Sequence, residues 1–592
     1  MLSTGGYLSF TAVVALIIAL VLAFVPCQSD TTYCYDTVTT LSDQGIKSNC
    51  FTVSPTGIFS RSSPDGIDNS SKRKGHVIPG LIDGHGHLLQ FGELLQSVNI
   101  FGASSLNDAI KRVEEYLEKH PNSGSATEWI RGTGWDQAAF GRMPTALDSP
   151  ETFSHVPDIA DLESSTNLAG KYIMLDRVDV HCIWVSASVL ALLSTPFPEI
   201  PGGEIITDPS PGVFCDNAMD IVLEHWPKPT KEKKTQFIKN AMVELNKVGL
   251  VGMADAGVPP SDLAIYEELA ERSSIDQEGD WTVRVYAMVE CAKRNTFCPE
   301  QAPWIDRADG MLSVKSVKLF GDGALGSWGS AMLEPYSDRS STTGSLLVNA
   351  STLESLTLQW SQAGYQVNIH AIGDLANRLA INSFTNAYPI ICPGIGGEDC
   401  QKKRRFRIEH SQIVHPNDQK RMFEVGIIPS IQPTHATSDM SYAEDRLGDK
   451  RTADEAYKMR SFLPLHPILG SDFPVEPANP FEGIFAAVTR KSPRTGLGKN
   501  GAEHGWHLEE ALSLDQALRG FTHGPAHGTF MEGKVGVIQE GAFADWVVLD
   551  EPLDRLALDD LRKVKVRETW VSGRCVYRRE EQSEPVAKQE LK

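Results

Sequence analysis

From about residue 236 onward, helix-like and strand-like segments alternate with a regularity that few folds accommodate. Short apolar runs recur between stretches of helical periodicity, which is the pattern of parallel βα units. Together with the apolar run at 76–83, the strand-like runs lie at 249–254, 281–289, 314–320, 365–369, 406–409, 426–431 and 467–470. Eight such units close into a barrel. The sequence therefore predicts an α/β fold built on a distorted (β/α)8 barrel of the TIM type.

The parts of the chain on either side of this alternation are predicted to form smaller units. Residues 31–75 and 531–578 are both rich in short β-like runs and turns, so we expect them to pair as one composite β-sandwich domain. The barrel takes residues 76–530, in which 93–120 has the spacing of an amphipathic helix. Residues 125–235 mix short strands and helices without clear alternation, and we interpret them as an α+β insertion that shapes the substrate pocket.

The first 30 residues are predicted to target the chain to a membrane. Tyr7 to Val25 carry no charge, and an apolar run of that length can cross a bilayer as a helix. The run is long for a cleaved signal and no small-x-small cleavage site follows it, which favours a signal anchor over a signal peptide. We expect the catalytic domain in the secretory lumen or outside the cell, with a secreted protein as the alternative. At the other end, the charged segment 579–592 is predicted to be disordered.

Cysteine spacing predicts structural disulfides of an oxidising compartment, with reduced buried thiols as the alternative. The candidate pairs are Cys34 with Cys50, Cys182 with Cys215, Cys291 with Cys298, and Cys392 with Cys400. The cysteines do not have the CxxC spacing of a zinc ribbon. Asn69 and Asn349 begin glycosylation sequons, which predict a glycoprotein although such tripeptides also arise by chance.

Charge excludes one broad class of partner. The formal net charge is −21 and the isoelectric point is about 5.2. Nucleic-acid binding requires a basic footprint, which this composition lacks. We therefore expect no nucleic-acid partner, whereas a homo-oligomer is compatible with the sequence.

Metal-ligating residue types stand at the ends of several predicted strands. His85 and His87 follow the strand at 76–83 two positions apart, so an extended chain directs both to the same side. Later strand ends carry Lys318, His370, His410 and Asp472. The carboxyl ends of barrel strands meet at one face, where catalytic sites lie. A single residue of this kind usually has a structural role, but six of them at strand ends predict a site for a divalent ion such as zinc.

This order of residues resembles the amidohydrolase superfamily, and more closely its amidohydrolase-3 branch, which includes N-substituted formamide deformylase-like enzymes. The resemblance covers about residues 33–577. Its motifs are Gly80-Leu-Ile-Asp-Gly-His-Gly-His87, Gly132-Thr-Gly-Trp-Asp136, Lys318-Leu-Phe-Gly-Asp-Gly323, Asn368-Ile-His-Ala-Ile-Gly-Asp374, Arg407-Ile-Glu-His410, Gly470-Ser-Asp-Phe-Pro474 and Gly541-Ala-Phe-Ala-Asp545. They are specific for fold and metal centre and carry little information about substrate.

The resemblance implies a centre of one or two divalent ions, expected to be zinc, in which Lys318 is carboxylated and bridges the ions. One ion would take His85, His87, Lys318 and Asp472, and the other would take Lys318, His370 and His410. The ions would lower the pKa of a shared water towards neutrality. Asp472 would accept the proton of that water and later pass it to the leaving amine.

Five further residues are candidates for substrate contact, namely Trp135, Asp136, His181, Asp322 and His435. The first two and Asp322 belong to the motifs above, whereas His435 follows the seventh predicted strand. His181 lies in a segment that resembles the family except that Val180 stands where glycine is usual, and a structural role for His181 is the alternative. His466, next to the eighth strand, is interpreted as a structural residue or as support for a ligand.

These features predict a metal-dependent hydrolase that cleaves carbon–nitrogen bonds other than peptide bonds in a small amide-type molecule, using a metal-activated hydroxide. An esterase or lactonase with the same centre is one alternative. The other is a membrane-tethered binding protein that has lost catalysis, although the presence of all six candidate ligands counts against it.

Overall fold

The computed structural model describes residues 29–43, 49–62, 72–140, 156–208, 210–276 and 279–580. The predicted signal anchor, the sequon at Asn69 and nearly all of the predicted disordered tail lie outside these ranges. Within them, every helix is too short or too polar to cross a membrane.

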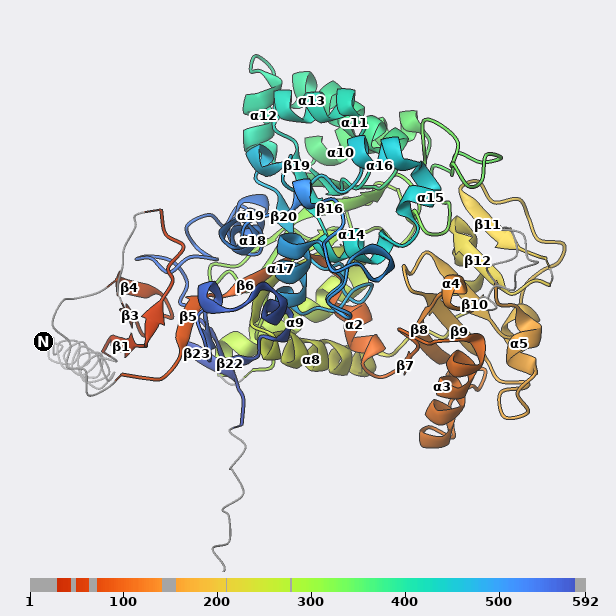
Figure 1. The fold of residues 1–592 in the computed structure, drawn as a ribbon, viewed down its shortest axis with the longest axis horizontal. Coiled ribbons are helices and arrows are strands. Elements are labelled where there is room, and N and C mark those ends of the chain that lie inside the picture. The colour runs from red at the N-terminus through yellow and green to blue at the C-terminus, as the bar shows by residue number, and fades with distance from the viewer. Residues whose placement is uncertain are drawn as a thin grey trace, which may run out of the picture.

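A parallel sheet of eight strands forms the centre of the molecule (Figure 1). In spatial order its strands are β20 (Ile468–Leu469), β19 (Ile428–Ile431), β18 (Arg407–His410), β17 (Gln366–Ala371), β16 (Leu312–Phe320), β14 (Arg284–Val289), β13 (Leu250–Val258) and β6 (Leu81–Gly86). A parallel bridge between Gly86 and Phe473 joins the two edges. The predicted (β/α)8 barrel is therefore confirmed.

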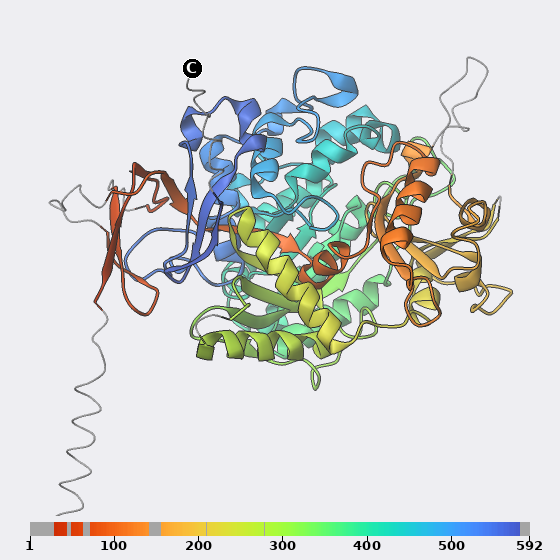
Figure 2. The same ribbon diagram turned by 90° about the horizontal axis from the view of Figure 1, so that it is seen from below.

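Helices cover the outside of the barrel, which explains why its strands are apolar throughout (Figures 1 and 2). All nine residues of β13 are buried. The longer covering helices are α8 (Lys231–Lys247), α9 (Pro260–Asp276), α10 (Ala350–Gln362), α11 (Asp374–Ile391), α13 (Pro416–Val425) and α17 (Pro480–Thr489). The connection 290–311 between β14 and β16 holds no helix but a two-residue strand, β15 (Ile305–Asp306), so the barrel is distorted there.

The apolar run at 76–83 is two strands rather than the single one expected. β5 (His76–Pro79) pairs with β21 (Trp546–Leu549) outside the barrel, and β6 begins at Leu81. The chain passes from one sheet to the other at Gly80, where a Cβ atom would lie 2.4 Å from Cγ2 of Val251. Glycine therefore permits the close approach, and the continuous apolar character of the run concealed the break.

The two ends of the chain form the composite β domain, as predicted for the fold class. One of its sheets contains β1 (Thr31–Cys34), β3 (Cys50–Val53) and β4 (Phe59–Ser62), and the other contains β2 (Thr37–Val38), β5, β21, β22 (Val566–Val571) and β23 (Arg574–Arg578). Between them the rings of Trp546 and Trp570 stack at 4.7 Å. The Arg284 guanidinium on β14 donates to both carboxylate oxygens of Asp545, at 2.7 and 2.9 Å, which fixes this domain to the barrel.

The inserted domain is built around a six-stranded sheet on the opposite side of the barrel (Figures 1 and 2). Its order is β11 (Gly203–Ile206), β12 (Val213–Asp216), β10 (Cys182–Val185), β9 (Ile173–Arg177), β8 (Ile130–Trp135) and β7 (Val98–Asn99). The prediction of a single helix at 93–120 is wrong. Helix α2 (Leu88–Leu94) is followed by β7, and α3 (Leu106–Lys119) is a separate helix with Ser105 as its N-cap. The prediction failed because the apolar residues keep a helical spacing from α2 through β7 into α3.

All four predicted disulfides are present, namely Cys34–Cys50, Cys182–Cys215, Cys291–Cys298 and Cys392–Cys400. Cys575 is a free thiol. Asn349 is exposed and caps α10 by accepting from the Thr352 backbone N–H at 2.9 Å, while its glycosylation stays a prediction.

Candidate metal centre and its cavity

The carboxyl ends of the barrel strands open into a cavity of about 550 Å³. All six predicted ligands line it: His85, His87, Lys318, His370, His410 and Asp472. Strands β6, β16, β17 and β18 carry the four histidines and the lysine at or near their carboxyl ends. Asp472 follows β20. The parallel barrel thus brings together residues that are far apart in the chain, such as His87 and Asp472, which are 385 positions apart.

Within the cavity these side chains form one contiguous cluster. Asp472 Oδ1 lies 3.0 Å from His87 Nε2 and 3.4 Å from His85 Nε2. Lys318 Nζ is 3.4 Å from the same His85 nitrogen. The His410 ring lies 4.9 Å from the His85 ring and 4.5 Å from the His370 ring, measured between centroids.

The donor set fits a divalent cation. Ligand atoms of His85, His410 and Asp472 lie within 4.8 Å of one another. The His370 Nε2 atom is buried without a hydrogen-bond partner, as a coordinating nitrogen would be before a metal binds. Imidazole nitrogens with a carboxylate are typical zinc ligands.

Burial favours the uncharged form of three histidines in the cluster. It lowers the pKa of His85 to about 4 and holds those of His370 and His410 well below their ordinary value. Burial also lowers the pKa of Lys318. For Asp472 burial alone would raise the pKa, but neighbouring His85 and His87 more than offset it and hold the pKa well below the usual range. The site therefore presents lone pairs and a negative charge to its cavity.

Glu409 holds the first histidine, a role that the sequence reading missed. Its Oε2 lies 2.5 Å from His85 Nδ1, which leaves Nε2 directed at the cluster, and it also accepts from Arg407 at 3.0 Å. Both Arg407 and Glu409 are fully buried. A signal was present, because charged residues two apart in an otherwise apolar strand must face the same side and must be paired.

Asp83 ties the first strand to the last. Its carboxylate accepts from the Ser471 backbone N–H at 3.0 Å, from the Ser471 hydroxyl at 2.7 Å and from the His85 backbone N–H at 3.0 Å. The Asp472 backbone N–H donates in turn to the His85 carbonyl at 2.7 Å. These bonds fix His85 and Asp472 relative to each other before any ligand binds.

Three of the five predicted substrate residues have other partners. Trp135 is buried in the inserted domain, where its indole N–H donates to the Leu175 carbonyl at 2.8 Å. Asp136 lies 3.6 Å from the buried Arg177 guanidinium. Asp322 is fully buried and accepts backbone N–H groups of Ala331, Ile372 and Gly373. These three residues do not line the cavity, and their contact with substrate stays a prediction.

The other two lie near the cluster. The His435 ring stacks on His410 at 5.8 Å, with its Nε2 3.8 Å from Asp472 Oδ2. His181 lines the cavity, and its ring lies 5.4 Å from that of His370. His466, by contrast, precedes β20 and lines a different cavity.

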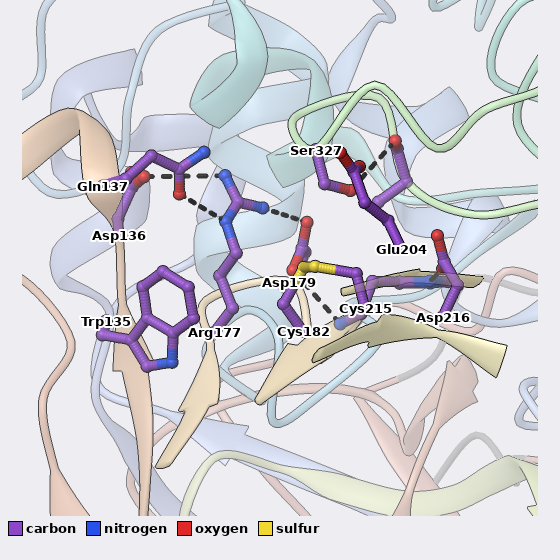
Figure 3. Close-up of a disulfide and its surroundings, with 12 residues drawn as sticks. Trp135, Asp136, Gln137, Arg177, Asp179, Cys182, Glu204, Cys215, Asp216 and Ser327 are labelled. Carbon is purple, nitrogen blue, oxygen red and sulfur yellow. Dashed lines mark hydrogen bonds and ion pairs between the residues drawn. A yellow bond between two sulfur atoms is a disulfide. The ribbon is translucent and has the colours of Figure 1, made fainter. Parts of the chain in front are cut away.

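The inserted domain forms one wall of the cavity through the turn between β9 and β10. Arg177 fixes this turn: its Nε donates to Gln137 Oε1 at 2.6 Å, and its guanidinium pairs with Asp179 (Figure 3). His181 is held in place because its Nδ1 lies 2.8 Å from Asp216 Oδ1. Asp216 is on β12, next to the Cys182–Cys215 disulfide seen in Figure 3.

A parallel eight-stranded barrel with histidines, a lysine and an aspartate converging at its strand ends defines a metal-dependent hydrolase of the amidohydrolase type. The amidohydrolase family model matches residues 74–577, and the chain belongs to that family. It is 27% identical to the putative amidohydrolase YtcJ of Bacillus subtilis (85% of this chain, 89% of the relative) and 24% identical to N-substituted formamide deformylase of Arthrobacter pascens (88% and 92%). A metal-dependent hydrolase structure from Pyrococcus horikoshii shares the fold, with a TM-score of 0.67 and 22% identity over 90% of this chain and 99% of that one.

Proposed function

We propose that this protein hydrolyses a carbon–nitrogen bond other than a peptide bond in a small amide-type substrate, with a divalent metal ion at the strand-end cluster. The observation that carries the proposal is the convergence of Asp472 with four histidines and a lysine in one cavity. Within that cluster the buried His370 Nε2 atom has no hydrogen-bond partner. The A. pascens relative, named for deformylation of N-substituted formamides, supports the choice of bond.

Zinc is the proposed ion, in one or two copies. His85, His87, Lys318 and Asp472 would hold one, and Lys318, His370 and His410 the other. A lysine ammonium has no lone pair to donate to a metal, whereas a carbamate offers two oxygens. Only an uncharged amine reacts with carbon dioxide, and the burial that lowers the pKa of Lys318 favours that form. When bound, the metal supplies Lewis acidity that polarises a carbonyl and acidifies a water.

The chain's own residues would then move the proton and orient the substrate. Asp472, ionised among its histidines, would accept a proton from the attacking water and deliver it to the leaving nitrogen. Glu409 would keep His85 in the tautomer whose Nε2 is free to ligate. The inserted domain would limit the entry of water and hold the organic part of the substrate against its side of the cavity.

Metal content per chain is the measurement that tests this proposal, on the whole protein and on its His370→Ala variant. We expect one or two zinc ions per chain, fewer in the variant, and hydrolysis within a panel of N-substituted formamides, acyl-amino acids and matching esters. Hydrolysis of esters alone would move the assignment to an esterase. A folded protein that was never exposed to chelator and holds no metal would overturn the proposal.

We also propose a membrane-anchored protein whose catalytic domain lies outside the cytosol. The four disulfides support this location, because such bonds persist in oxidising compartments. Sequencing of the mature N-terminus tests the anchor: a chain that starts near Asp30 would instead be a secreted protein.

A further inference from the structure

Val180, in the turn that closes the cavity, has a backbone conformation that valine rarely adopts. Its φ is 55°, in the left-handed region where the Cβ atom crowds the carbonyl oxygen. For a β-branched residue this is an outlier, since both γ-methyl groups add to the crowding. Outliers of this kind persist where the surroundings enforce them and gather at functional sites. Glycine would adopt the same φ without strain.

The turn itself enforces this conformation. The Val180 N–H donates to the Arg177 carbonyl at 2.9 Å and so closes the turn between β9 and β10. On one side of Val180, Asp179 is held by the Arg177 guanidinium. On the other side, the ring of His181 is held by Asp216 at 2.8 Å. Rotation of the Val180 backbone would break at least one of these contacts.

Asp216 is in turn fixed from two directions. Its backbone N–H donates to the His181 carbonyl at 2.8 Å, next to the cross-strand pair Cys182 and Cys215 that a disulfide joins (Figure 3). Its carboxylate fits against the barrel loop after β16. A Cβ atom on Gly323 would lie 2.5 Å from Oδ1 and one on Gly329 2.7 Å from Oδ2. The wall that carries Val180 is therefore anchored to both the inserted domain and the barrel.

Val180 lines the same cavity as the candidate ligands. Its neighbour in the chain, His181, has its ring 5.4 Å from the His370 ring, so the turn stands beside the metal-ligand cluster. Among the other apolar lining residues, Phe320 shares this side of the cavity, with its ring 5.8 Å from the His370 ring, whereas Trp226 packs under the Arg131 guanidinium at 4.3 Å. Valine thus adds a rigid apolar branch at the side of the cavity where the reacting group must bind.

We propose that Val180 is a specificity-determining residue that narrows the cavity beside the metal centre and restricts the acyl group of the substrate to formyl or acetyl size. This inference rests on the proposed function, because it places the acyl group next to the metal ligands. The larger, amine-derived part of the substrate then occupies the remaining cavity. The strained backbone is retained because glycine, which fits the turn, would leave that space open.

Alkyl hydroxamates test the inference without requiring turnover, because they bind metal ions through the hydroxamate and differ only in the attached group. The zinc-loaded full chain and its Val180→Gly variant are titrated with acetohydroxamate and hexanohydroxamate. We expect the wild-type protein to bind acetohydroxamate more tightly. We expect Val180→Gly to shift the ratio of the two dissociation constants by at least ~10-fold towards the longer compound, since single methylenes change discrimination by such factors.

Val178→Gly is the matched control. Val178 lies in the same turn but does not line the cavity, and its φ is not in the left-handed region. We expect this control to keep the wild-type ratio and to unfold at a lower temperature, whereas Val180→Gly unfolds at or above the wild-type temperature because the strain is relieved.

An unchanged ratio in Val180→Gly, with hydroxamates bound, would overturn the inference and leave the metal centre standing. Equal ratio changes in both variants would overturn it as well, since they would reflect a general loosening of the turn. If zinc-loaded protein binds neither hydroxamate, the metal centre of the proposed function fails and the inference fails with it. The unfolding temperatures separate these cases, because relief of strain at Val180 does not depend on metal.

Discussion

Two cavities of this molecule are lined by histidines, and they lie towards opposite ends of the barrel strands. The candidate metal centre follows the strands, whereas the second cavity, of about 720 Å³, includes His466 before β20 together with His523 and His527. The second is the larger of the two. Size and the mere presence of histidines therefore do not identify the site.

The difference lies in burial and in where each side chain is directed. His85 is 1% exposed and its carboxylate partner Glu409 is fully buried, whereas His527 and its partner Glu532 are 32% and 42% exposed. His527 Nδ1 lies 2.9 Å from Glu532 and His523 Nε2 lies 3.4 Å from Arg519, so each has a local partner. In the described part of the chain, only His85, His410 and Asp472 form a close group of metal-ligand type. Convergence of desolvated groups, rather than their number, distinguishes the site.

The largest effect that separates the two cavities is expected from Asp472→Asn. The substitution keeps the shape of the side chain but removes the charge that accepts the proton, so activity should fall by about 10³-fold. The rate should be measured on a hydrolysed substrate of the panel, with metal content determined in parallel. His527→Asn is the control and should retain wild-type activity. Equal losses in the two variants would contradict the distinction drawn between the cavities.

Glu409→Gln sharpens the comparison, because Glu409 and Glu532 both hold a histidine. Loss of the Glu409 carboxylate should weaken zinc binding by about 10- to 100-fold, since partners that orient a metal-bound histidine contribute that much to affinity. Zinc affinity measured by competition with a chelator gives the value, with circular dichroism to show that the variant is folded. Glu532→Gln should bind zinc with wild-type affinity, and a matching loss there would show that the effect is not local.

The sequence predicts the barrel and its six inward residues because one rule covers them all: side chains at the carboxyl ends of parallel strands meet at one face. That rule needs no knowledge of loops. It also separates Asp472, which follows β20, from His466, which precedes it. The same reading failed at two breaks that the spacing of the apolar residues does not mark. Gly80 divides an apolar run into strands of two sheets, and β7 interrupts what resembled one helix at 93–120.

The inserted domain itself was predicted, but the form of the cavity wall that it supplies was not, for a different reason. Its contribution to the cavity depends on a turn whose shape is enforced by Arg177, Asp216 and a disulfide, and these contacts join residues from three strands. The sequence marks Val180 only as a departure from the usual glycine. Asp322 is the converse case: its motif suggests substrate contact, and only the structure shows that three backbone N–H groups donate to its carboxylate.

Removal of two histidines from the second cavity should have little effect. In the double variant His466→Ala and His527→Ala we expect zinc content equal to that of the wild-type protein. The free energy of unfolding should fall by no more than about 1 kcal/mol, since partly exposed side chains with local partners contribute little. Metal analysis and denaturant titration provide both values. A fall in zinc content would mean that this end of the barrel also holds metal.

The smallest expected effect is the pH dependence of the pair His527 and Glu532. Burial alone would raise the pKa of Glu532, but hydrogen bonds from His527 and Arg405 more than offset it and lower the pKa to about 2. A carboxylate whose pKa is lower in the folded state than in the unfolded chain stabilises the fold above its unfolded pKa, and this contribution is lost as the pH falls through the folded value. Glu532→Gln should therefore destabilise the protein at pH 7 by about 0.5 kcal/mol, a value typical of half-exposed ion pairs screened by water. The difference from wild type should shrink as the pH falls from 4.5 towards 2, which denaturant titrations at pH 7, 4 and 3 would measure. A difference that stays constant with pH would mean that packing of the side chain, rather than its charge, stabilises this end of the barrel.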